Sequence, residues 1–99
     1  MKLHQQARVL ADPLRLRILR ALAREPALTT RELAERLRMP PATLYRHLRL
    51  LRRAGFLARS GRLPARYSVQ RQAVERFLGR LYALIQPPFR DPDEPYEDF

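Results

Sequence analysis

Cysteine is absent from the 99 residues of this chain. Its absence excludes disulfides, thiolate metal sites and cysteine nucleophiles. The two histidines, His4 and His47, are far apart in the sequence, which argues against a histidine-rich metal cluster within one chain. The sequence also lacks a phosphate-binding glycine loop and has no paired carboxylates in residues 1–86, so we expect no enzyme activity, no metal and no other cofactor.

Long apolar runs are absent as well. No stretch approaches the roughly 20 apolar residues of a membrane-spanning helix, and the start of the chain lacks the basic and apolar regions of an export signal. We therefore expect a cytoplasmic protein with no membrane partner. The length indicates one domain, and a chain this short hides only about 60–70% of the surface that its unfolded form exposes. Its core must be small, and a dimer interface would help to stabilise it.

Acidic residues are scarce except near the C-terminus. Residues 1–86 contain 19 arginine or lysine residues and five acidic ones, a net charge of +14, whereas residues 87–99 have a net charge of −4. Only Lys2 is lysine. Arginine binds phosphate groups and guanine edges better than lysine does, because its guanidinium can donate two hydrogen bonds at once. A GC-rich genome would explain the arginines without any function, but the physical result is in either case a surface that attracts nucleic acids.

Apolar residues at helical spacing predict five helices. Asp12-Pro13 marks the start of the second helix, and a Thr29–Glu32 capping box marks the start of the third. Pro41 begins the fourth helix, Pro40 takes its cap position without a capping side chain, and Gly55 ends it. The predicted helices cover residues 2–10, 13–24, 30–37, 41–54 and 71–86.

The spacing of apolar residues changes after Gly55. Residues 56–60 and 65–69 alternate in the manner of two short strands, joined by residues 61–64. A short helix, a tight turn, a longer helix and then a β-ribbon predict a mainly α (α+β) winged helix-turn-helix domain over residues 1–86. The acidic, proline-rich residues 87–99 have the composition of a disordered tail; alternatively, their charge of −4 would let them lie over the basic surface of residues 1–86 and compete there with nucleic-acid phosphates.

The predicted helix 41–54 carries arginines opposite its apolar stripe of Leu44, Leu48 and Leu51. A helix of this kind enters the major groove with its N-terminal residues at base edges, so Arg46 is the candidate for reading a guanine. An ordinary core helix with a solvated arginine face is the alternative, but the preceding turn, the following ribbon and the charge of +14 favour nucleic acid. The predicted DNA-binding residues are Pro41, Ala42, Thr43, Tyr45, Arg46, Arg49 and Arg53 on this helix and Arg59, Arg62 and Arg66 on the wing. His47 falls at the edge of the apolar stripe, where we expect a partly buried histidine with a hydrogen-bond partner.

The last predicted helix has more large apolar residues than a small domain usually needs from a terminal element. Together with the apolar stripe of the first helix, it is a candidate homodimer interface. The alternative is that this stripe only covers its own domain. The candidate interface residues are Leu3, Ala7, Leu10, Val74, Phe77, Leu78, Leu81, Leu84 and Ile85.

Three stretches resemble the ArsR-like winged helix-turn-helix transcriptional regulators: ADPLRLRILRAL, ELAERLRMPPATLYRHLRLLRRAGFL and ARYSV. The resemblance covers about residues 8–70. It implies a homodimer built from the first and last helices, a recognition helix at residues 41–54, a wing on the DNA, and repression as the usual output. Metal-sensing members carry cysteines in the third helix, or histidine and carboxylate ligands on the last. Residues 71–86 contain no histidine and only Glu75, so the metal-sensing role is not carried over.

We therefore predict a dimeric, sequence-specific regulator of transcription that binds double-stranded DNA, with repression as its expected output. One alternative is an RNA- or ribosome-associated basic module, which would need exposed aromatic side chains; Tyr45 is the only clear one on the basic face. Another is a protein-interaction winged helix with an acidic partner. The sequence does not identify a small-molecule effector.

Overall fold

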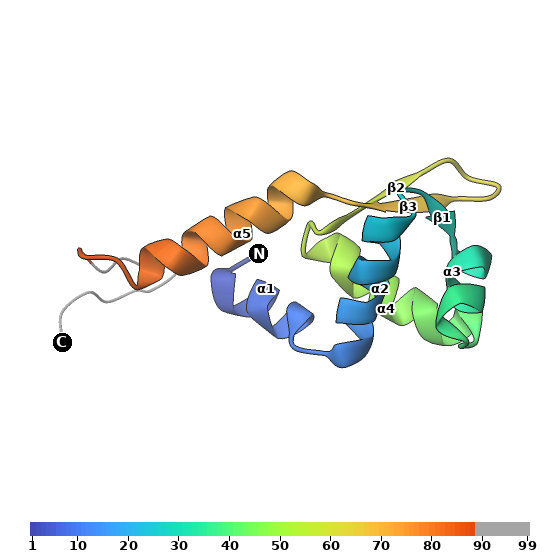
Figure 1. The fold of residues 1–99 in the computed structure, drawn as a ribbon, viewed down its shortest axis with the longest axis horizontal. Coiled ribbons are helices and arrows are strands. Elements are labelled where there is room, and N and C mark those ends of the chain that lie inside the picture. Colours follow the sequence, from blue (N-terminus) through green and yellow to red (C-terminus); the bar gives the residue numbers. More distant parts are fainter. Residues whose placement is uncertain (89–99) are drawn as a thin grey trace.

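Four helices gather around one apolar core, and a fifth helix extends away from them (Figure 1). The structure is a computed structural model, and it describes residues 1–88. The elements are α1 (Leu3–Leu10), α2 (Pro13–Arg24), β1 (Leu28–Thr29), α3 (Thr30–Leu37), α4 (Pro41–Arg53), β2 (Leu57–Ser60), β3 (Arg66–Val69) and α5 (Arg71–Leu84). The predicted tail therefore lies, from residue 89 onward, outside the described residues.

The helix starts follow from the capping chemistry that the sequence predicts. The Asp12 carboxylate accepts hydrogen bonds from the backbone N–H groups of Leu14 at 2.9 Å and Arg15 at 3.1 Å. At the start of α3, the Glu32 N–H donates to the Thr29 hydroxyl at 3.1 Å, and the Thr29 N–H donates to the Glu32 carboxylate at 2.9 Å. Both predicted caps are confirmed, and each satisfies backbone donors that a helix start leaves without partners.

The turn between α3 and α4 spans three residues, 38–40. Arg38 has the left-handed backbone conformation, with φ of 54°, and the Met39 N–H donates to the Ala34 carbonyl at 3.1 Å. Pro40 is extended and makes no capping hydrogen bond, and Pro41 is the first residue of α4, as predicted. The two prolines therefore begin the second helix of the pair instead of interrupting it.

The sheet has one strand more than the sequence predicts. Its strand order is β1-β3-β2, with both pairs antiparallel, so that Tyr67 in β3 lies between Leu28 and Arg59. Gly55, with φ of +88°, ends α4 and turns the chain into β2, as predicted. β1 is two residues long, too short to show an alternation, and its second residue is also the cap of α3. It forms only because β3 offers it a partner.

Large apolar side chains from α2, α3 and α4, and from Phe56 between α4 and β2, fill the core. The largest fully buried ones are Phe56, Ile18, Leu22, Leu33, Leu44, Leu48 and Leu51. Phe56 meets Phe77 of α5 edge to face, with ring centroids 5.7 Å apart. This contact and the packing of α1 against α5 hold the first part of α5, while its C-terminal part extends beyond the other helices (Figure 1).

We expect the protein to lose stability in acid, because three folded-state carboxylates are hydrogen-bonded. The pKa of Asp12 is lowered mainly by the Arg15 N–H, that of Glu25 by the Arg36 guanidinium, and that of Glu32 by the Thr29 N–H. A pKa that is lower in the folded state means that stability is present above the unfolded value and is lost as the pH falls through the folded one. The free energy of unfolding should stay level from about pH 7 to 5 and fall below about pH 4.

Urea unfolding followed by circular dichroism at a series of pH values measures this loss. Glu32→Gln should make the loss smaller. The matched control is Glu75→Gln, since Glu75 is an exposed carboxylate of α5 with no ion pair within residues 1–88. A wild-type profile that stays level down to pH 3 would contradict the prediction.

Candidate nucleic-acid interface

The exposed side of α4 carries every residue of this helix that the sequence predicts to bind DNA. All seven are exposed: Pro41, Ala42, Thr43, Tyr45, Arg46, Arg49 and Arg53. On the other side, Leu44, Leu48 and Leu51 are buried in the core. The first exposed residues of α4 are small, and the arginines follow about one, two and three turns later. A surface with this order lets the start of the helix approach a polyanion closely.

The wing, which consists of β2, β3 and the loop of residues 61–65, lies beside α4. Tyr45 of α4 and Arg59 and Arg62 of the wing line one hollow of about 430 Å³, together with Thr30 and Arg31 at the start of α3. We call the exposed side chains of α4 and of the wing the α4–wing surface. Arg31 was not among the predicted DNA-binding residues. The fold places it beside Tyr45 and the two wing arginines.

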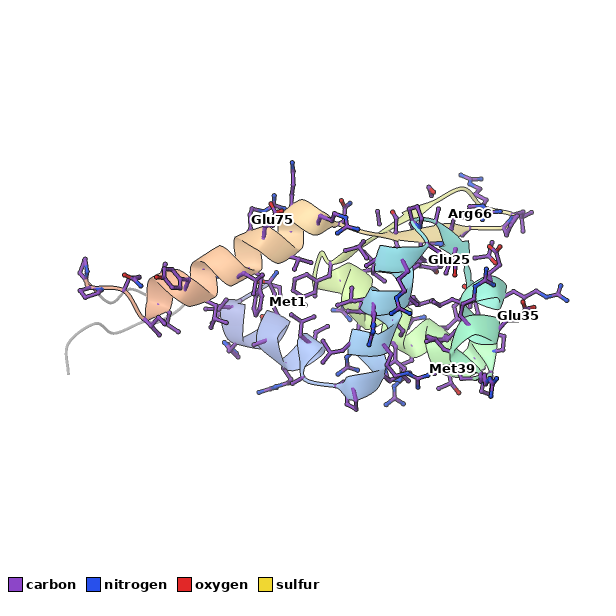
Figure 2. All side chains as sticks on the ribbon, in the orientation of Figure 1. Met1, Glu25, Glu35, Met39, Arg66 and Glu75 are labelled. Carbon is purple, nitrogen blue, oxygen red and sulfur yellow. The ribbon has the colours of Figure 1, made fainter. Side chains whose placement is uncertain are left out.

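Arg66, the third predicted wing residue, already has partners in the protein. Its guanidinium donates to the Glu32 carboxylate at 3.1 Å and to the Ala27 carbonyl at 3.3 Å. Its side chain is still about half exposed. Figure 2 shows Arg66 at the end of the molecule opposite to α5, the same end as Glu35 and Met39. Arg66 thus joins the wing to α3.

His47 lies at the edge of the core, with Arg15 as its hydrogen-bond partner. Nη1 of Arg15 is 3.2 Å from Nδ1 of His47, and Nε of Arg15 donates to the Val9 carbonyl. The histidine is partly buried, as predicted. Arg15 therefore connects the end of α1 and the start of α2 to the middle of α4.

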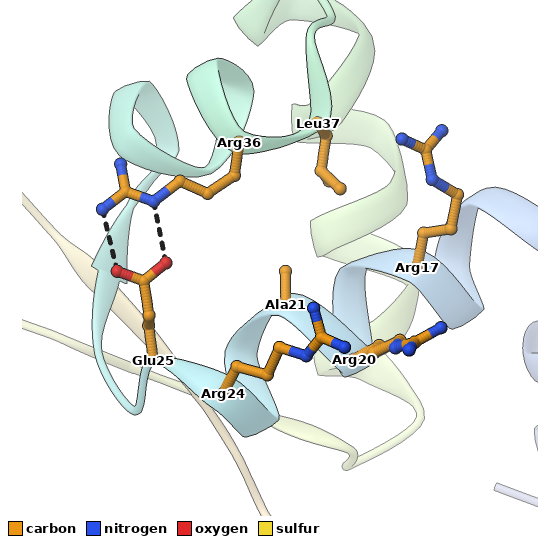
Figure 3. Close-up of a pocket in the computed structure, with 7 residues that line it drawn as sticks. All are labelled: Arg17, Arg20, Ala21, Arg24, Glu25, Arg36 and Leu37. Atoms are coloured by element: carbon orange, nitrogen blue, oxygen red, sulfur yellow. Dashed lines mark hydrogen bonds and ion pairs between the residues drawn. The ribbon is translucent and has the colours of Figure 1, made fainter.

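A second group of arginines lies on α2 and does not belong to the α4–wing surface (Figure 3). Arg17, Arg20 and Arg24 surround a hollow of about 390 Å³. Arg36 of α3 also lines this hollow, and its guanidinium donates two hydrogen bonds of 2.8 Å to the Glu25 carboxylate. In Figure 1, α2 crosses in front of α4, and the apolar faces of both helices are buried in the same core. Positive charge therefore covers more than one side of the molecule, and charge alone does not identify the DNA-binding side.

Two other kinds of feature are not found in the described part of the chain. No helix within residues 1–88 is long and apolar enough to cross a membrane. Within the same residues, no three or more histidine, aspartate or glutamate side chains gather where they could hold a metal ion.

A short helix, a three-residue turn, a second helix with an exposed basic face and an adjoining β-ribbon define the winged helix-turn-helix class. A family model described as a helix-turn-helix domain matches residues 10–59, and the chain belongs to this family. The search of curated proteins gave no match.

Solved structures of transcriptional regulators have the same fold. NolR from Sinorhizobium fredii superposes with a TM-score of 0.66 and 25% sequence identity, over 83% of this chain and 82% of NolR. An ArsR family transcriptional regulator gives a TM-score of 0.64 and 27% identity, over 83% of this chain and 88% of its own. The AntR antimony-specific transcriptional repressor gives a TM-score of 0.61 and 27% sequence identity, over 80% of this chain and 73% of AntR. The resemblance to ArsR-like regulators and the winged fold are confirmed, and the protein is a DNA-binding transcriptional regulator. Proteins of this class are not enzymes.

Proposed function

We propose that this protein is a homodimer that binds a specific double-stranded DNA sequence and represses transcription without a bound metal. The observation that supports this most is the exposed face of α4, where small residues precede Arg46 and the wing lies alongside. In this proposal, residues 1–86 form the DNA-binding unit and residues 87–99 are an appended acidic segment. The proposal places the protein in the cytoplasm, together with the DNA that it regulates. The absence of cysteine supports independence from thiolate-bound metals.

In the proposed complex, α4 enters the major groove. Pro41 and Ala42 allow close approach, and Arg46 reads a guanine with two hydrogen bonds. Thr43 and Tyr45 contact a thymine methyl group or a phosphate.

The remaining arginines bind the DNA backbone. Arg49 and Arg53 of α4 and Arg59 and Arg62 of the wing contact phosphates. Arg66 has a smaller role in DNA binding than its exposure suggests, because its guanidinium already forms an ion pair with the Glu32 carboxylate. We assign to it the orientation of the wing in addition to a phosphate contact.

The proposed dimer uses the apolar side of α5. Leu78, Leu81, Tyr82 and Ile85 are 55%, 42%, 62% and 64% exposed, and together they line one hollow. Their spacing of three, four and seven residues places them on one face of the helix. An apolar face of this kind on a terminal helix is typical of a protein–protein contact, and a two-fold axis lets the same face pair with itself.

The other predicted interface residues lie in the core of their own chain or pack against it. Leu3 and Phe77 are buried in the core of their own chain. Ala7, Leu10, Val74 and Leu84 are packed partly against that core. We therefore assign direct contact with the partner to the exposed side chains and a supporting role to the buried ones. Tyr82 was not predicted, although its spacing of four residues from Leu78 could have identified it.

Selection of genomic DNA fragments on the purified protein, followed by gel-shift titration, tests the proposed function. A bound fragment should be preferred over random duplex by about 1,000-fold or more at about 150 mM salt. Equal binding of selected and random duplex would contradict sequence-specific regulation. Stronger binding of single-stranded or structured RNA would instead favour an RNA-binding module.

Arg62→Ala is expected to weaken binding to all duplexes by a similar factor, because a phosphate contact carries no sequence information. The slope of log K against log salt should become shallower by about one unit. Fluorescence anisotropy between 50 and 200 mM salt measures both effects. Arg20→Ala is the matched control, since it removes the same charge from α2. If both variants changed the slope alike, the effect would come from net charge, and the assignment of Arg62 would be wrong.

A further inference from the structure

A hollow of about 450 Å³ lies between α1 and the second half of α4. One part of its wall is apolar and another part is cationic. The apolar side chains are Met1, Val9 and Leu50, and the cationic ones are Arg8, Arg15 and Arg53. Small-molecule sites typically combine apolar walls with a few polar groups in volumes of about 300–1,000 Å³. The hollow in Figure 3 differs from it, because charged side chains form most of its lining.

Arg15 is the least exposed cation of this hollow. Its side chain is only 14% exposed. Its Nε and Nη1 face the Val9 carbonyl and His47, whereas no partner within residues 1–88 accepts the hydrogen bonds of Nη2. Nη1 also forms a long ion pair with the Asp12 carboxylate at 3.9 Å, which is beyond hydrogen-bond distance. Within residues 1–88 no buried side-chain nitrogen lacks a partner, so Nη2 of Arg15 is accessible to solvent and can donate to a ligand. A carboxylate is the acceptor that matches the shape and charge of a guanidinium.

The same hollow is connected to the helix that we propose to enter the major groove. Leu50 and Arg53 belong to α4, and His47 of α4 is bonded to Arg15. The Gln6 side chain donates to the Ala54 carbonyl at 3.0 Å, which holds α1 against the end of α4. A molecule in this hollow would therefore contact α4 directly. It would also bind the guanidinium of Arg15, which is bonded to His47 of the same helix.

We propose that this hollow binds a small organic acid with an apolar body and that its occupation weakens DNA binding. The carboxylate binds Arg15 with support from the arginines at the rim, and the apolar body packs on Val9 and Leu50. The direction of the effect follows from charge. An acid that engages Arg53 removes one proposed phosphate contact, and its carboxylate places a negative charge beside α4, where it repels the DNA phosphates. The effect on DNA rests on the proposed function, but the binding of the acid does not.

Octanoate is the probe, titrated into the 15N-labelled full chain without DNA. We expect saturable shifts of the Val9 and Leu50 amides and of the Arg15 Nε–H, with a dissociation constant on the order of 1 mM or below for a ligand of about ten heavy atoms. Acetate lacks the apolar body and octanamide lacks the charge, so each should bind at least about fivefold more weakly. Equal effects of acetate and octanoate would overturn the site. So would octanoate shifts confined to residues 78–85, at the end of α5 and its C-cap.

Arg8→Glu separates binding in the hollow from general attraction to a basic protein. Arg8 is exposed on α1, so the variant should fold normally, which circular dichroism verifies. Charge reversal at the rim should weaken octanoate binding by about tenfold or more. Arg20→Glu is the matched control, because it makes the same charge change on α2, and it should bind octanoate as the wild type does. Equal losses in the two variants would show that binding is not localised and would overturn the proposal.

The effect on DNA is measured by anisotropy on a selected duplex with and without saturating octanoate. We expect about a fivefold to tenfold loss of DNA affinity at low salt and, by reciprocity, an equal loss of octanoate affinity when DNA is bound. Octanoate should still weaken DNA binding by the Arg20→Glu variant, and it should not weaken DNA binding by the Arg8→Glu variant. Unchanged DNA affinity at saturating octanoate would overturn the regulatory half of the proposal. A protein that bound octanoate but no DNA would instead contradict the proposed function and leave the acid site standing.

Discussion

Leu81→Glu is expected to convert a dimer into a folded monomer and to reduce affinity for a two-half-site DNA by about 100-fold or more. Leu81 is 42% exposed on the apolar side of α5, so the change should alter the stability of the monomer by only about 0.5 kcal/mol. In the dimer, the new carboxylate would be buried against its own symmetry copy, which combines desolvation with repulsion between like charges. The loss of DNA affinity follows because the second half-site is no longer bound within the same molecule.

Light scattering coupled to size-exclusion chromatography measures the mass, and anisotropy on one-site and two-site duplexes measures the affinity. Ala83→Glu is the matched control, because Ala83 is exposed on another side of the same helix and does not line the apolar hollow. It should remain dimeric. The two recognition helices of the intact dimer should read half-sites about 34–36 Å apart, and changing this spacing by half a helical turn should weaken binding as much as Leu81→Glu does. A wild-type monomer in solution would contradict the proposed dimer directly.

Local chemistry explains which parts of the fold could be predicted from the sequence. The caps at Asp12 and Thr29 and the turn at Gly55 each depend on residues within three or four positions, and all three were predicted correctly. The end of α5 also follows a local rule. The helix was predicted to reach residue 86 but ends at Leu84, since residues that precede a proline avoid helical geometry and Pro87 follows shortly.

Contacts between distant residues could not be predicted in the same way. The pairing of Leu28 with Tyr67 creates β1, and 39 positions separate the two residues. The helical wheel placed His47 at the edge of the core, but it could not name Arg15 as its partner. Arg66 has the appearance of a free wing arginine in the sequence, and only the fold shows its bond to Glu32. The spacing of apolar residues thus predicts which face of a helix or strand is buried, whereas the partner that a residue contacts there depends on tertiary packing.

The charge of the chain predicts the kind of partner but not the side of the molecule that binds it. A net charge of +14 over residues 1–86 indicates a polyanion as partner, but arginines also gather on α2 in Figure 3. What distinguishes α4 is shape: small residues at its start, arginines behind them and a wing alongside. A single arginine on α4 should therefore affect sequence preference in a way that an arginine on α2 does not.

Arg46→Ala is expected to lower affinity for the selected duplex by about 10- to 100-fold, which corresponds to about 1–3 kcal/mol. Affinity for random duplex should change much less, because nonspecific binding depends on the sum of phosphate contacts. Arg46 is exposed on α4 and makes no ion pair within residues 1–88, so its removal should not affect folding. Substituting each base pair of the selected duplex in turn should show that the variant has lost discrimination at one position in each half-site.

Arg49→Ala is the control for Arg46→Ala, because it removes the same charge one turn further along α4. Because Arg49 is assigned a phosphate contact, Arg49→Ala should lower affinity for selected and random duplex by the same factor and leave the base preferences unchanged. The contrast between the two variants separates reading of bases from attraction to the backbone. If Arg46→Ala weakened both duplexes equally, α4 would bind only the backbone at this position, and sequence preference would have to come from the other exposed side chains of α4 or from the shape of the DNA.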